Sequence, residues 1–464
     1  MSGKRNKTKW PYLLMRVGTI TAGTLFLGRA LAGYTSKWIA TRFMTEPYEN
    51  NLWEGVSAGA RTTPQVIVET NMRAENGKKI LRPFGGPKRF PDFSAIMFDV
   101  AQLHTFPVSE DVEIITSTKI GPLARRPLCL DIPIMISGMA YGFALSEKAK
   151  LALAKGASQA GTATNSGYGP FLQEERDAAK HLIVQYSRGN WSKEPEILRK
   201  ANAVEIQLGQ GALGGTGEIF KRDKMDQKMI RLLGLKPGEN AVLHARMPEI
   251  SSPAQLAGLV EDLKQITEGI PVGVKIAAGN NLENDLAYII DAQADFVAID
   301  GAQGGTAGAA PILEDDFGLP TMHALCRAVN FLEQQGVKKE ISLIIGGGLK
   351  TPGDYLKALA LGADAVALGT IALWAMTHTQ VFKSLPYEPP VQVVFFAGQD
   401  KEAFDVDKGA QNLANYLVST VDEMKIAAAA LGKKSLQAVN KEDLFALDRD
   451  TAEIADIYLA WDNG

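Results

Sequence analysis

One feature restricts the fold of this chain more than any other: an apolar run that ends in a glycine-rich loop, repeated three times. The first run, Phe296–Ile299, leads into the stretch Asp300–Pro311, and Ile344–Gly353 and Ala365–Thr370 repeat the arrangement. Short, partly β-branched apolar runs bounded by turn formers are typical of buried strands. Glycines at their ends let a backbone approach a ligand without a Cβ clash. One such loop is usually a structural turn, but three in series predict a ligand-binding rim.

Eight strand candidates follow one another from Ile132 onward, and helical patterns separate most of them. The strands are Ile134–Ser137, Thr162–Asn165, Leu182–Tyr186, Val204–Gln207, Val272–Ile276, Phe296–Ile299, Ser342–Ile345 and Ala365–Leu368. The helices include Leu145–Gln159, Pro253–Thr267 and Leu282–Ala292. Such alternation predicts a parallel sheet covered by helices. Eight units favour a closed (β/α)8 TIM barrel in the α/β class; a doubly wound open sheet stays open, because sequence cannot show closure.

The chain before the first predicted strand differs in composition from the rest. No acidic residue lies before Glu46, and basic residues crowd the start. The apolar run Val17–Gly28, flanked by Arg16 and Arg29, is shorter than the roughly 20 residues that cross a bilayer, although snorkelling arginines can extend a span. We expect membrane association. A spanning helix, an interfacial helix, a signal-like anchor, a transit peptide and a helix packed on the globular domain all stay open.

We expect four parts along the chain. They are a basic and hydrophobic membrane-associating segment (1–45), an irregular N-terminal cap region (46–131), the barrel (132–400) and a C-terminal helical extension (401–464). A long insertion, Gly209–Met247, follows the fourth strand of the barrel.

Composition excludes several classes of function. A net charge of −3 disfavours nucleic acid as a partner, because such proteins present a basic face. Cys129 and Cys326 are the two cysteines, too few for a disulfide scaffold or for ligating a cluster alone. The five histidines show no metal spacing, so we expect no metal site. No nucleophile elbow, Walker loop or dinucleotide-binding glycine loop is evident, so we expect no NAD(P)H site.

In a barrel of this kind the site lies at the carboxyl ends of the strands, and phosphate often binds the loops after strands seven and eight. Those loops are Gly346-Gly347-Gly348 and Gly369-Thr370. Backbone N–H groups there, with the following helix N-terminus, can hold a dianion. Ser137-Gly138-Met139 ends the first strand and Asn165-Ser166-Gly167 the second, so these residues share the same rim.

Lys275 ends the fifth strand and is expected to point into the barrel mouth. A charge there is costly without a partner, so Lys275 is either functional or simply paired with an acid such as Asp300. If a flavin is bound, a cation near N1 would stabilise the anionic reduced ring. Gln207, at the end of the fourth strand, could hydrogen-bond the same edge. The following loop, Gln210–Glu218, is either a flexible insertion or an ordered loop over the substrate.

Taken together, these residues resemble the FMN-binding synthase domain of glutamate synthase. They resemble more closely the stand-alone FMN-binding glutamate synthase family of bacteria, which often carries a hydrophobic N-terminus. The similarity covers roughly residues 112–433 and includes a C-terminal helix near Leu413–Leu431. The matching motifs are Ser137–Gly142, Gly161–Gly167, Ile206–Ala212, Val274-Lys275, Gly304-Gly305-Thr306 and the two phosphate loops.

The resemblance implies an FMN enzyme that reduces 2-iminoglutarate, formed from 2-oxoglutarate and ammonia, to L-glutamate by hydride transfer from reduced FMN. It implies catalytic roles for Lys275 and Gln207, and contacts of Gln210, Asp300 and Thr306 with the substrate. The implied FMN-binding residues are Ser137, Gly138, Met139, Thr164, Asn165, Gln207, Lys275, Gly304, Gly305, Gly346, Gly347, Gly348, Gly369 and Thr370.

Three departures from the family pattern bear on the substrate. Ala372–Thr379 contains no cysteine, where the large enzymes carry an iron–sulfur signature. Met1-Ser2 offers no nucleophilic cysteine, so we expect no glutaminase domain. Leu213-Gly214-Gly215 replaces a Lys-Pro-Gly run, and Tyr168 stands where many relatives have glutamate. Fold and FMN are unaffected by these changes, but glutamate does not follow as the product.

Other functions therefore stay open. A hydroxy-acid oxidase would need a histidine base near an arginine after strand six, which Asp300–Gln303 lacks. An inosine monophosphate dehydrogenase would need a rim cysteine, whereas Cys326 lies in a predicted helix. Another FMN-barrel oxidoreductase, acting on a different 2-oxo, 2-hydroxy or amino acid, and a membrane-tethered electron-transfer flavoprotein are the alternatives.

The expected partners follow from the reaction. We expect a small 2-oxo or amino acid substrate and a separate electron-donor protein or NAD(P)H reductase; a glutaminase partner and homo-oligomerisation are left open. The expected location is a membrane surface, with the catalytic domain in the cytoplasm.

Overall fold

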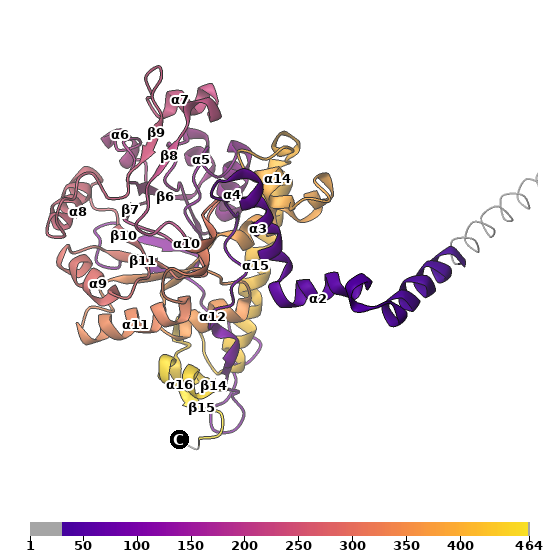
Figure 1. Ribbon diagram of the computed structural model, residues 1–464. Coiled ribbons are helices and arrows are strands. Elements are labelled where there is room, and N and C mark those ends of the chain that lie inside the picture. Colours follow the sequence, from indigo (N-terminus) through magenta and orange to yellow (C-terminus); the bar gives the residue numbers. More distant parts are fainter. Residues whose placement is uncertain (1–29, 463–464) are drawn as a thin grey trace, which may run out of the picture. The chain divides into compact units, whose positions relative to one another are not determined.

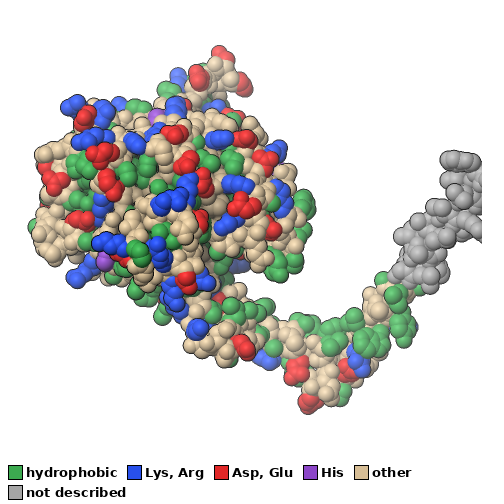
Figure 2. Space-filling view, turned by 90° about the horizontal axis from the view of Figure 1, so that it is seen from above, with side chains coloured by type: hydrophobic (Ala, Val, Ile, Leu, Met, Phe, Trp, Pro, Cys, Tyr) green, Lys and Arg blue, Asp and Glu red, His purple; other side chains and the backbone are tan. Residues whose placement is uncertain are grey.

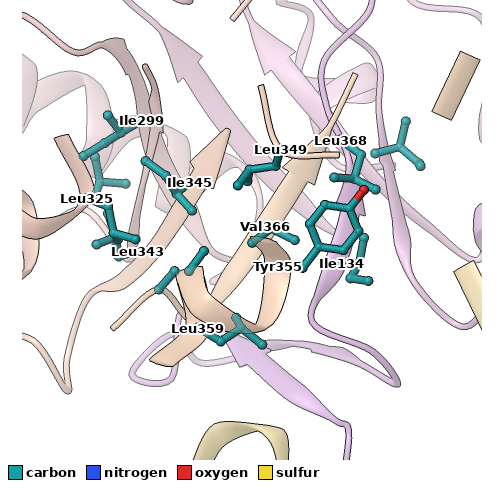
Figure 3. Close-up of a cluster of buried hydrophobic side chains, with 14 of the residues drawn as sticks. Ile134, Ile299, Leu325, Leu343, Ile345, Leu349, Tyr355, Leu359, Val366 and Leu368 are labelled. Carbon is teal, nitrogen blue, oxygen red and sulfur yellow. The ribbon is translucent and has the colours of Figure 1, made fainter. Parts of the chain in front are cut away.

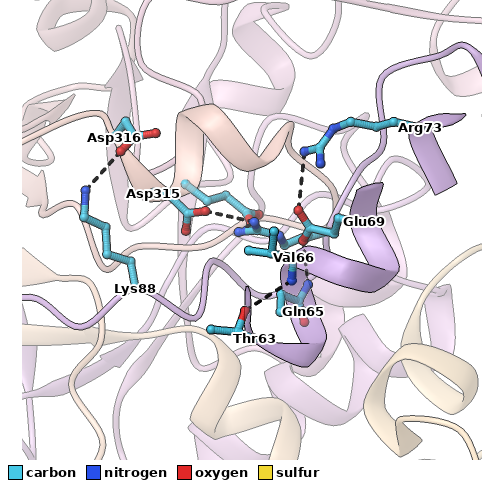
Figure 4. A network of polar contacts seen from close by, with 10 residues as sticks. Thr63, Gln65, Val66, Glu69, Arg73, Lys88, Asp315 and Asp316 are labelled. Carbon is cyan, nitrogen blue, oxygen red and sulfur yellow. Dashed lines mark hydrogen bonds and ion pairs between the residues drawn. The ribbon is translucent and has the colours of Figure 1, made fainter. Parts of the chain in front are cut away.

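The computed structural model describes residues 30–462, which divide between Ile80 and Leu81 into two units. In the first unit, residues 30–45 are helical, and η1 (Tyr48–Asn50), α2 (Trp53–Thr62) and α3 (Pro64–Asn76) follow. The Thr63 hydroxyl accepts the backbone N–H of Val66 and so caps α3 (Figure 4). Glu69 accepts from Gln65 and pairs with Arg73 on the same helix (Figure 4). The predicted four-part division of the chain stays a prediction.

The surface of the first unit is rich in exposed hydrophobic side chains (Figure 2). The large ones are Leu31, Tyr34, Trp38, Ile39, Met44, Tyr48, Leu52, Trp53, Val56, Val66, Val68 and Met72. Within residues 30–462, no helix is both long and apolar enough to cross a membrane. The predicted membrane-associating run Val17–Gly28 lies outside the described residues.

An eight-stranded parallel sheet forms the centre of the second unit, as predicted (Figure 1). Its strand order is β4-β13-β12-β11-β10-β7-β6-β5. In chain order the strands are β4 (Ile134–Ile136), β5 (Ala163–Asn165), β6 (His181–Tyr186), β7 (Ala203–Gln207), β10 (Val272–Ala277), β11 (Phe296–Asp300), β12 (Ser342–Gly346) and β13 (Ala365–Leu368). β4 and β5, the two ends of this order, lie side by side, and the Asp131 N–H donates to the Gly161 carbonyl beside them. The sheet therefore closes into the predicted barrel, and the open-sheet alternative is wrong.

Helices surround the barrel between successive strands (Figure 1). They are α4 (Glu147–Gln159), α5 (Gln173–Ala178), α6 (Pro195–Leu198), α8 (Gln255–Ile266), α9 (Leu282–Asp291), α10 (Pro311–Asp315), α11 (Thr321–Gln334) and α12 (Pro352–Ala360). After β13 come α13 (Thr370–Thr377), η4 (His378–Lys383), α14 (Pro389–Val394) and the long α15 (Val406–Ala430). α15 packs against α4 and α12. A Cβ at Gly156 of α4 would lie 2.9 Å from the Ala410 carbonyl oxygen, so this glycine lets the two helices approach closely.

Two apolar layers hold the barrel together. The outer layer lies between the sheet and its helices, where Leu343 and Ile345 of β12 meet Leu325 of α11 and Leu359 of α12 (Figure 3). The inner layer fills the barrel near the amino ends of its strands. A hairpin of β2 (Thr118–Ile120) and β3 (Leu128–Leu130) packs there. The inner cluster contains Ile120, Leu128, Leu130, Met135, Ala163, Ile183, Ala203, Phe296, Ala298, Ile344 and Ala365. This end of the barrel is therefore closed and apolar.

Further segments cover the carboxyl ends of the strands. The insertion after β7 forms β8 (Glu218–Phe220), α7 (Gln227–Leu232) and β9 (Ala241–Leu243). β1 (Ile96–Phe98), β14 (Leu444–Ala446) and β15 (Tyr458–Leu459) form a small separate sheet next to α16 (Arg449–Ala455). The strap 81–95 crosses the loop after β11. Arg82 bridges to Ala309 through the backbone and pairs with Asp315 at 2.8 Å, while Lys88 pairs with Asp316 at 3.0 Å (Figure 4).

Candidate active site

The carboxyl ends of the barrel strands open into a cavity of about 1410 Å3. Its walls come from the loops after β4, β11, β12 and β13, together with the strap 81–95 and Gln210 from the loop after β7. This is the end of the barrel at which parallel strands and their loops place reactive groups.

Lys275 lies beneath the floor of this cavity. Its side chain is only 2% exposed, and its ammonium nitrogen lies 3.3 Å from Asp300 Oδ2 and 3.3 Å from the Ser137 hydroxyl, to which it donates. Asp300 and Ser137 both line the cavity, whereas Lys275 does not. Burial lowers the pKa of Lys275, but the negative charges of Asp300 and Glu205 outweigh it, so the pKa is raised overall. Lys275 therefore forms the ion pair with Asp300 that the sequence analysis considered possible. Of the two residues, Asp300 is the one that lines the cavity.

Glu205, which the sequence analysis did not single out, is the centre of a buried polar network. It lies on β7, and one carboxylate oxygen accepts from Asn165 at 2.9 Å and from Gln185 at 2.8 Å. These three residues come from three neighbouring strands. A buried carboxylate needs such partners to offset its lost hydration. A lone acid in the otherwise apolar run Ala203–Ile206 was the signal that could have identified it.

Arg188 is a second functional candidate that the sequence analysis missed. It follows β6, is fully buried, and donates to Gln207 and to the backbone oxygens of Thr216 and Ala245. Its remaining terminal nitrogen has no hydrogen-bond partner among residues 30–462, and burial lowers the pKa of the group. Gln207 in turn donates to Gln210 on the cavity wall. Arg188 is therefore a buried cation that hydrogen bonds link, through Gln207 and Gln210, to the cavity wall.

The loop Gln210–Glu218 is packed onto the rim. The Gly211 N–H donates to Asp300, and a Cβ at Gly211 would lie 2.6 Å from the Gly304 oxygen. Leu213 is buried in an apolar cluster with Tyr168 and Trp191. The beginning of this loop is thus an ordered part of the cavity wall. Leu213 packs in the apolar cluster.

A second cavity, of about 550 Å3, lies on the other side of this wall. It is lined mainly by apolar and small residues of α8, α9 and the loops after β7, β10 and β11, with Arg246 and Asp285 among its polar residues. Asp300 and Ala302 belong to the walls of both cavities. The two cavities therefore share Asp300 as a wall residue.

Comparison with known proteins gives the family. Residues 93–434 match the family model described as the conserved region in glutamate synthase. The chain belongs to the glutamate synthase family. It is 32% identical to a glutamate synthase large subunit-like protein of Rhizobium meliloti (strain 1021), over 85% of this chain and 93% of that protein. This confirms the resemblance that the motifs indicated.

Two further similarities are informative. The chain is 34% identical to an archaeal glutamate synthase (NADPH) of Methanocaldococcus jannaschii, over 69% of this chain and 62% of that protein. A solved structure described as a lactate oxidase of Pediococcus acidilactici has a TM-score of 0.50 at 17% identity, covering 77% of this chain and 85% of that one. At that identity the likeness shows the shared fold alone.

As a member of this family the chain is an FMN-dependent oxidoreductase, and the loops after β12 and β13 fit the phosphate of FMN. Gly347 and Gly348 have φ angles of +109° and +71°, which side-chain-bearing residues rarely adopt. Gly369 precedes α13 without a side-chain cap, and a Cβ built on it would meet nothing within 4 Å. The first N–H groups of α13 thus lack a side-chain cap beside open space, which suits a phosphate.

The predicted site residues divide into two groups. Those that line the large cavity are Ser137, Gly138, Met139, Gln210, Asp300, Gly304, Gly305, Thr306, Gly347, Gly348, Gly369 and Thr370. Those that lie beneath its floor, within the strands, are Thr164, Asn165, Gln207, Lys275 and Gly346. The structure brings both groups to one end of the barrel, and their individual roles stay predictions. Among the described residues, no group of three or more histidine, cysteine or acidic side chains could hold a metal ion.

Proposed function

We propose that this glutamate synthase family member reduces a 2-imino acid to an L-amino acid, and that the substrate is 2-iminoglutarate, formed from 2-oxoglutarate and ammonia. The product is then L-glutamate. The observation that carries the proposal is the buried Lys275–Asp300 ion pair. Its aspartate lines the cavity whose walls include the loops after β12 and β13, which fit the phosphate of FMN. A preorganised charge pair in a site of this kind stabilises charge that changes during the reaction.

Bound FMN would supply the hydride in this reaction, and the chain supplies charge and position. The Asp300 carboxylate would accept the N–H of the protonated imine and so hold its carbon in one orientation. Lys275 would keep Asp300 in place and ionised, and its ammonium would offset the negative charge of the substrate. Hydride addition to the protonated imine then gives the neutral amine, which takes its last proton from solvent.

A dicarboxylate substrate suits the buried cations. Lys275 already has two acidic neighbours, Asp300 and Glu205, whereas the side-chain hydrogen bonds of Arg188 within the described part of the chain go to neutral oxygens. A carboxylate bound near Gln210 and Thr306 would bring a negative charge toward Arg188. Leu213 offers no charge, so a 2-oxo acid with a less acidic side chain is the second candidate substrate.

The second cavity favours separate entry of the nitrogen donor. Because both cavities share Asp300 as a wall residue, an amine that enters through the smaller one would arrive at the carboxylate that is to hold the imine. We propose that a separate donor protein or reductase supplies the electrons and that a partner can supply ammonia. The printed name of the archaeal relative, which includes NADPH, supports a reductant of that kind.

The proposal is tested by reducing the bound flavin anaerobically and titrating it with 2-oxoglutarate plus ammonia. We expect the flavin to reoxidise and glutamate to appear in equal amount. Pyruvate plus ammonia serves as the matched control for a 2-oxo acid with no second carboxylate. A flavin that stays reduced with both acids would contradict imine reduction, and faster reoxidation by pyruvate would exclude glutamate as the product.

We also propose that the first unit attaches the enzyme to a membrane surface, with the barrel in the cytoplasm. Exposed aromatic residues such as Tyr34, Trp38 and Trp53 are the kind that favour the bilayer interface, and the apolar run Val17–Gly28 precedes them in the sequence. Flotation with anionic vesicles is the test. We expect the full chain to float and a chain that begins at Leu81 to stay at the bottom; equal behaviour would contradict the proposal.

A further inference from the structure

Lys150 is a fully buried lysine that the proposed reaction does not use. It lies on α4, with its side chain 0% exposed. Its ammonium group donates to the backbone oxygen of Met139 at 2.7 Å and to that of Asn165 at 2.8 Å. It also forms an ion pair with Glu175 of α5 at 2.9 Å. One side chain thus holds two backbone segments and a second helix.

The two backbone segments belong to loops that are predicted to bind FMN. Met139 belongs to the loop after β4 and lines the large cavity, whereas Asn165 is the last residue of β5. The same two loops interlock directly. Gly167 has a φ of +66°, and a Cβ there would lie 2.5 Å from the backbone nitrogen of Ala140. Neither loop can shift without displacing the other, and Lys150 fixes both from below.

Stability alone does not account for a lysine at this position. The neighbouring buried positions of α4 carry apolar residues, among them Ala149, Ala152 and Leu153. Well-packed apolar residues often replace a buried ion pair without loss of stability, because the pair must offset its own desolvation. The charged group does something here that an apolar side chain cannot do: it binds two carbonyl oxygens of different loops at once.

We propose that Lys150 is a positioning residue of the FMN site, which sets the relative placement of the Ser137–Met139 and Asn165–Gly167 loops, and that Glu175 provides its counter-charge. Asn165 passes this placement on, because its amide donates to Glu205, which lies close enough to influence Lys275 electrostatically. The inference rests on FMN binding and is independent of the substrate.

Three variants test it. Lys150→Met removes the ammonium group that binds both loops but leaves Glu175 as an unpaired buried acid. Lys150→Met/Glu175→Met removes both charges. It therefore separates the loss of the two loop contacts from the presence of an unpaired charge. Lys155→Met is the matched control, because Lys155 lies on the same helix and pairs with the exposed Asp407 at 2.7 Å, away from both loops. The measurements are the FMN dissociation constant, from flavin fluorescence, and the reduction potential of the bound flavin.

We expect the FMN dissociation constant to rise at least about tenfold in both Lys150 variants. In the double variant the potential should also shift, while its thermal midpoint stays near that of the native protein and the control matches it in every measurement. If the single variant does not fold, the double variant decides. A double variant with native FMN affinity and potential would overturn the proposal, and so would one that fails to fold, because the pair would then serve folding alone.

Neither readout needs turnover of an imine. A failure of the proposed reaction would therefore leave this test standing.

Discussion

Strand β11 has an aspartate at each end, and each aspartate pairs with a lysine. Asp295 directly precedes the strand and pairs with Lys264 at 2.9 Å, whereas Asp300 ends it and pairs with Lys275 at 3.3 Å. The side chain of Lys264 is 27% exposed and that of Lys275 is 2% exposed. The same chemical pair thus occurs in two different surroundings.

The surroundings explain the difference between the pairs. Asp295 accepts the backbone N–H of Val272, and Lys264 donates to the Gln293 carbonyl, so this pair joins α8 to the starts of β10 and β11. Asp300 instead faces both cavities. At the amino end of the barrel the ion pair thus connects elements, whereas at the carboxyl end it places a charge at the walls of two cavities.

The largest expected effect is that of Lys275→Met. Because the charge beside Ser137 and Asp300 is lost at the proposed reacting end, we expect turnover to fall by about 100- to 1000-fold. Anaerobic reoxidation of the flavin by the imine measures it, with circular dichroism as the check on folding. Native turnover in a folded variant would end the functional interpretation of the pair.

Gly369→Glu tests the same end at the phosphate position. A Cβ at Gly369 meets nothing within 4 Å, so we expect the variant to fold. Its carboxylate at the start of α13 should repel the FMN phosphate and raise the dissociation constant on the order of 100-fold. Gly369→Gln, of equal size and neutral, should weaken binding less. Equal affinities in the two variants would show that charge is irrelevant there.

Lys264→Met removes the partner of Asp295 at the amino end. A partly exposed pair contributes little, so we expect the free energy of unfolding to fall by about 1 kcal/mol and turnover to stay within about twofold of native. Urea unfolding and the reoxidation assay measure the two quantities. A loss of turnover as large as that of Lys275→Met would remove the distinction between the two ends.

The smallest expected effect is on the pH dependence of the free energy of unfolding. Burial lowers the pKa of Lys275, but Asp300 and Glu205 raise it above its ordinary 10.5. The folded state therefore binds this proton more tightly than the unfolded state. Its contribution to stability is complete below pH 10.5 and is lost as the pH rises through the folded-state pKa. We expect the native protein to lose more stability than Lys275→Met above that pH; identical alkaline profiles in urea unfolding would contradict this.

Much of the barrel could be predicted from the sequence because its signals are local. Strands that are buried on both faces appear in the sequence as apolar runs, as in Phe296–Ile299. The glycines that follow these runs predict the positions of the rim loops. Twelve of the predicted site residues line one cavity for the same reason. The hairpin β2–β3 and the strap 81–95 were not predicted, because their short, irregular segments are ordered only by contacts with distant strands.

Three further buried polar residues, Lys150, Arg188 and Glu205, escaped prediction for a different reason. Lys150 lies in a stretch whose pattern predicts an ordinary amphipathic helix. Only the fold shows that its ammonium group donates to the backbone oxygens of Met139 and Asn165. Arg188 follows a strand without any motif around it. For Glu205 a signal was present, since an acid in an apolar strand requires a partner, but the partner lies on another strand.

The packing of α15 on α4 has a consequence for synthesis on the ribosome. Lys155 of α4 and its partner Asp407 of α15 are separated by 252 residues. At about 5–20 residues per second, translation of that interval takes on the order of tens of seconds. During this time the outer face of α4 lacks its cover, and β4 lacks its neighbour β13. In a nascent chain, the outer face of α4 therefore stays uncovered until α15 has left the ribosome, and the free edge of β4 stays uncovered until β13 has.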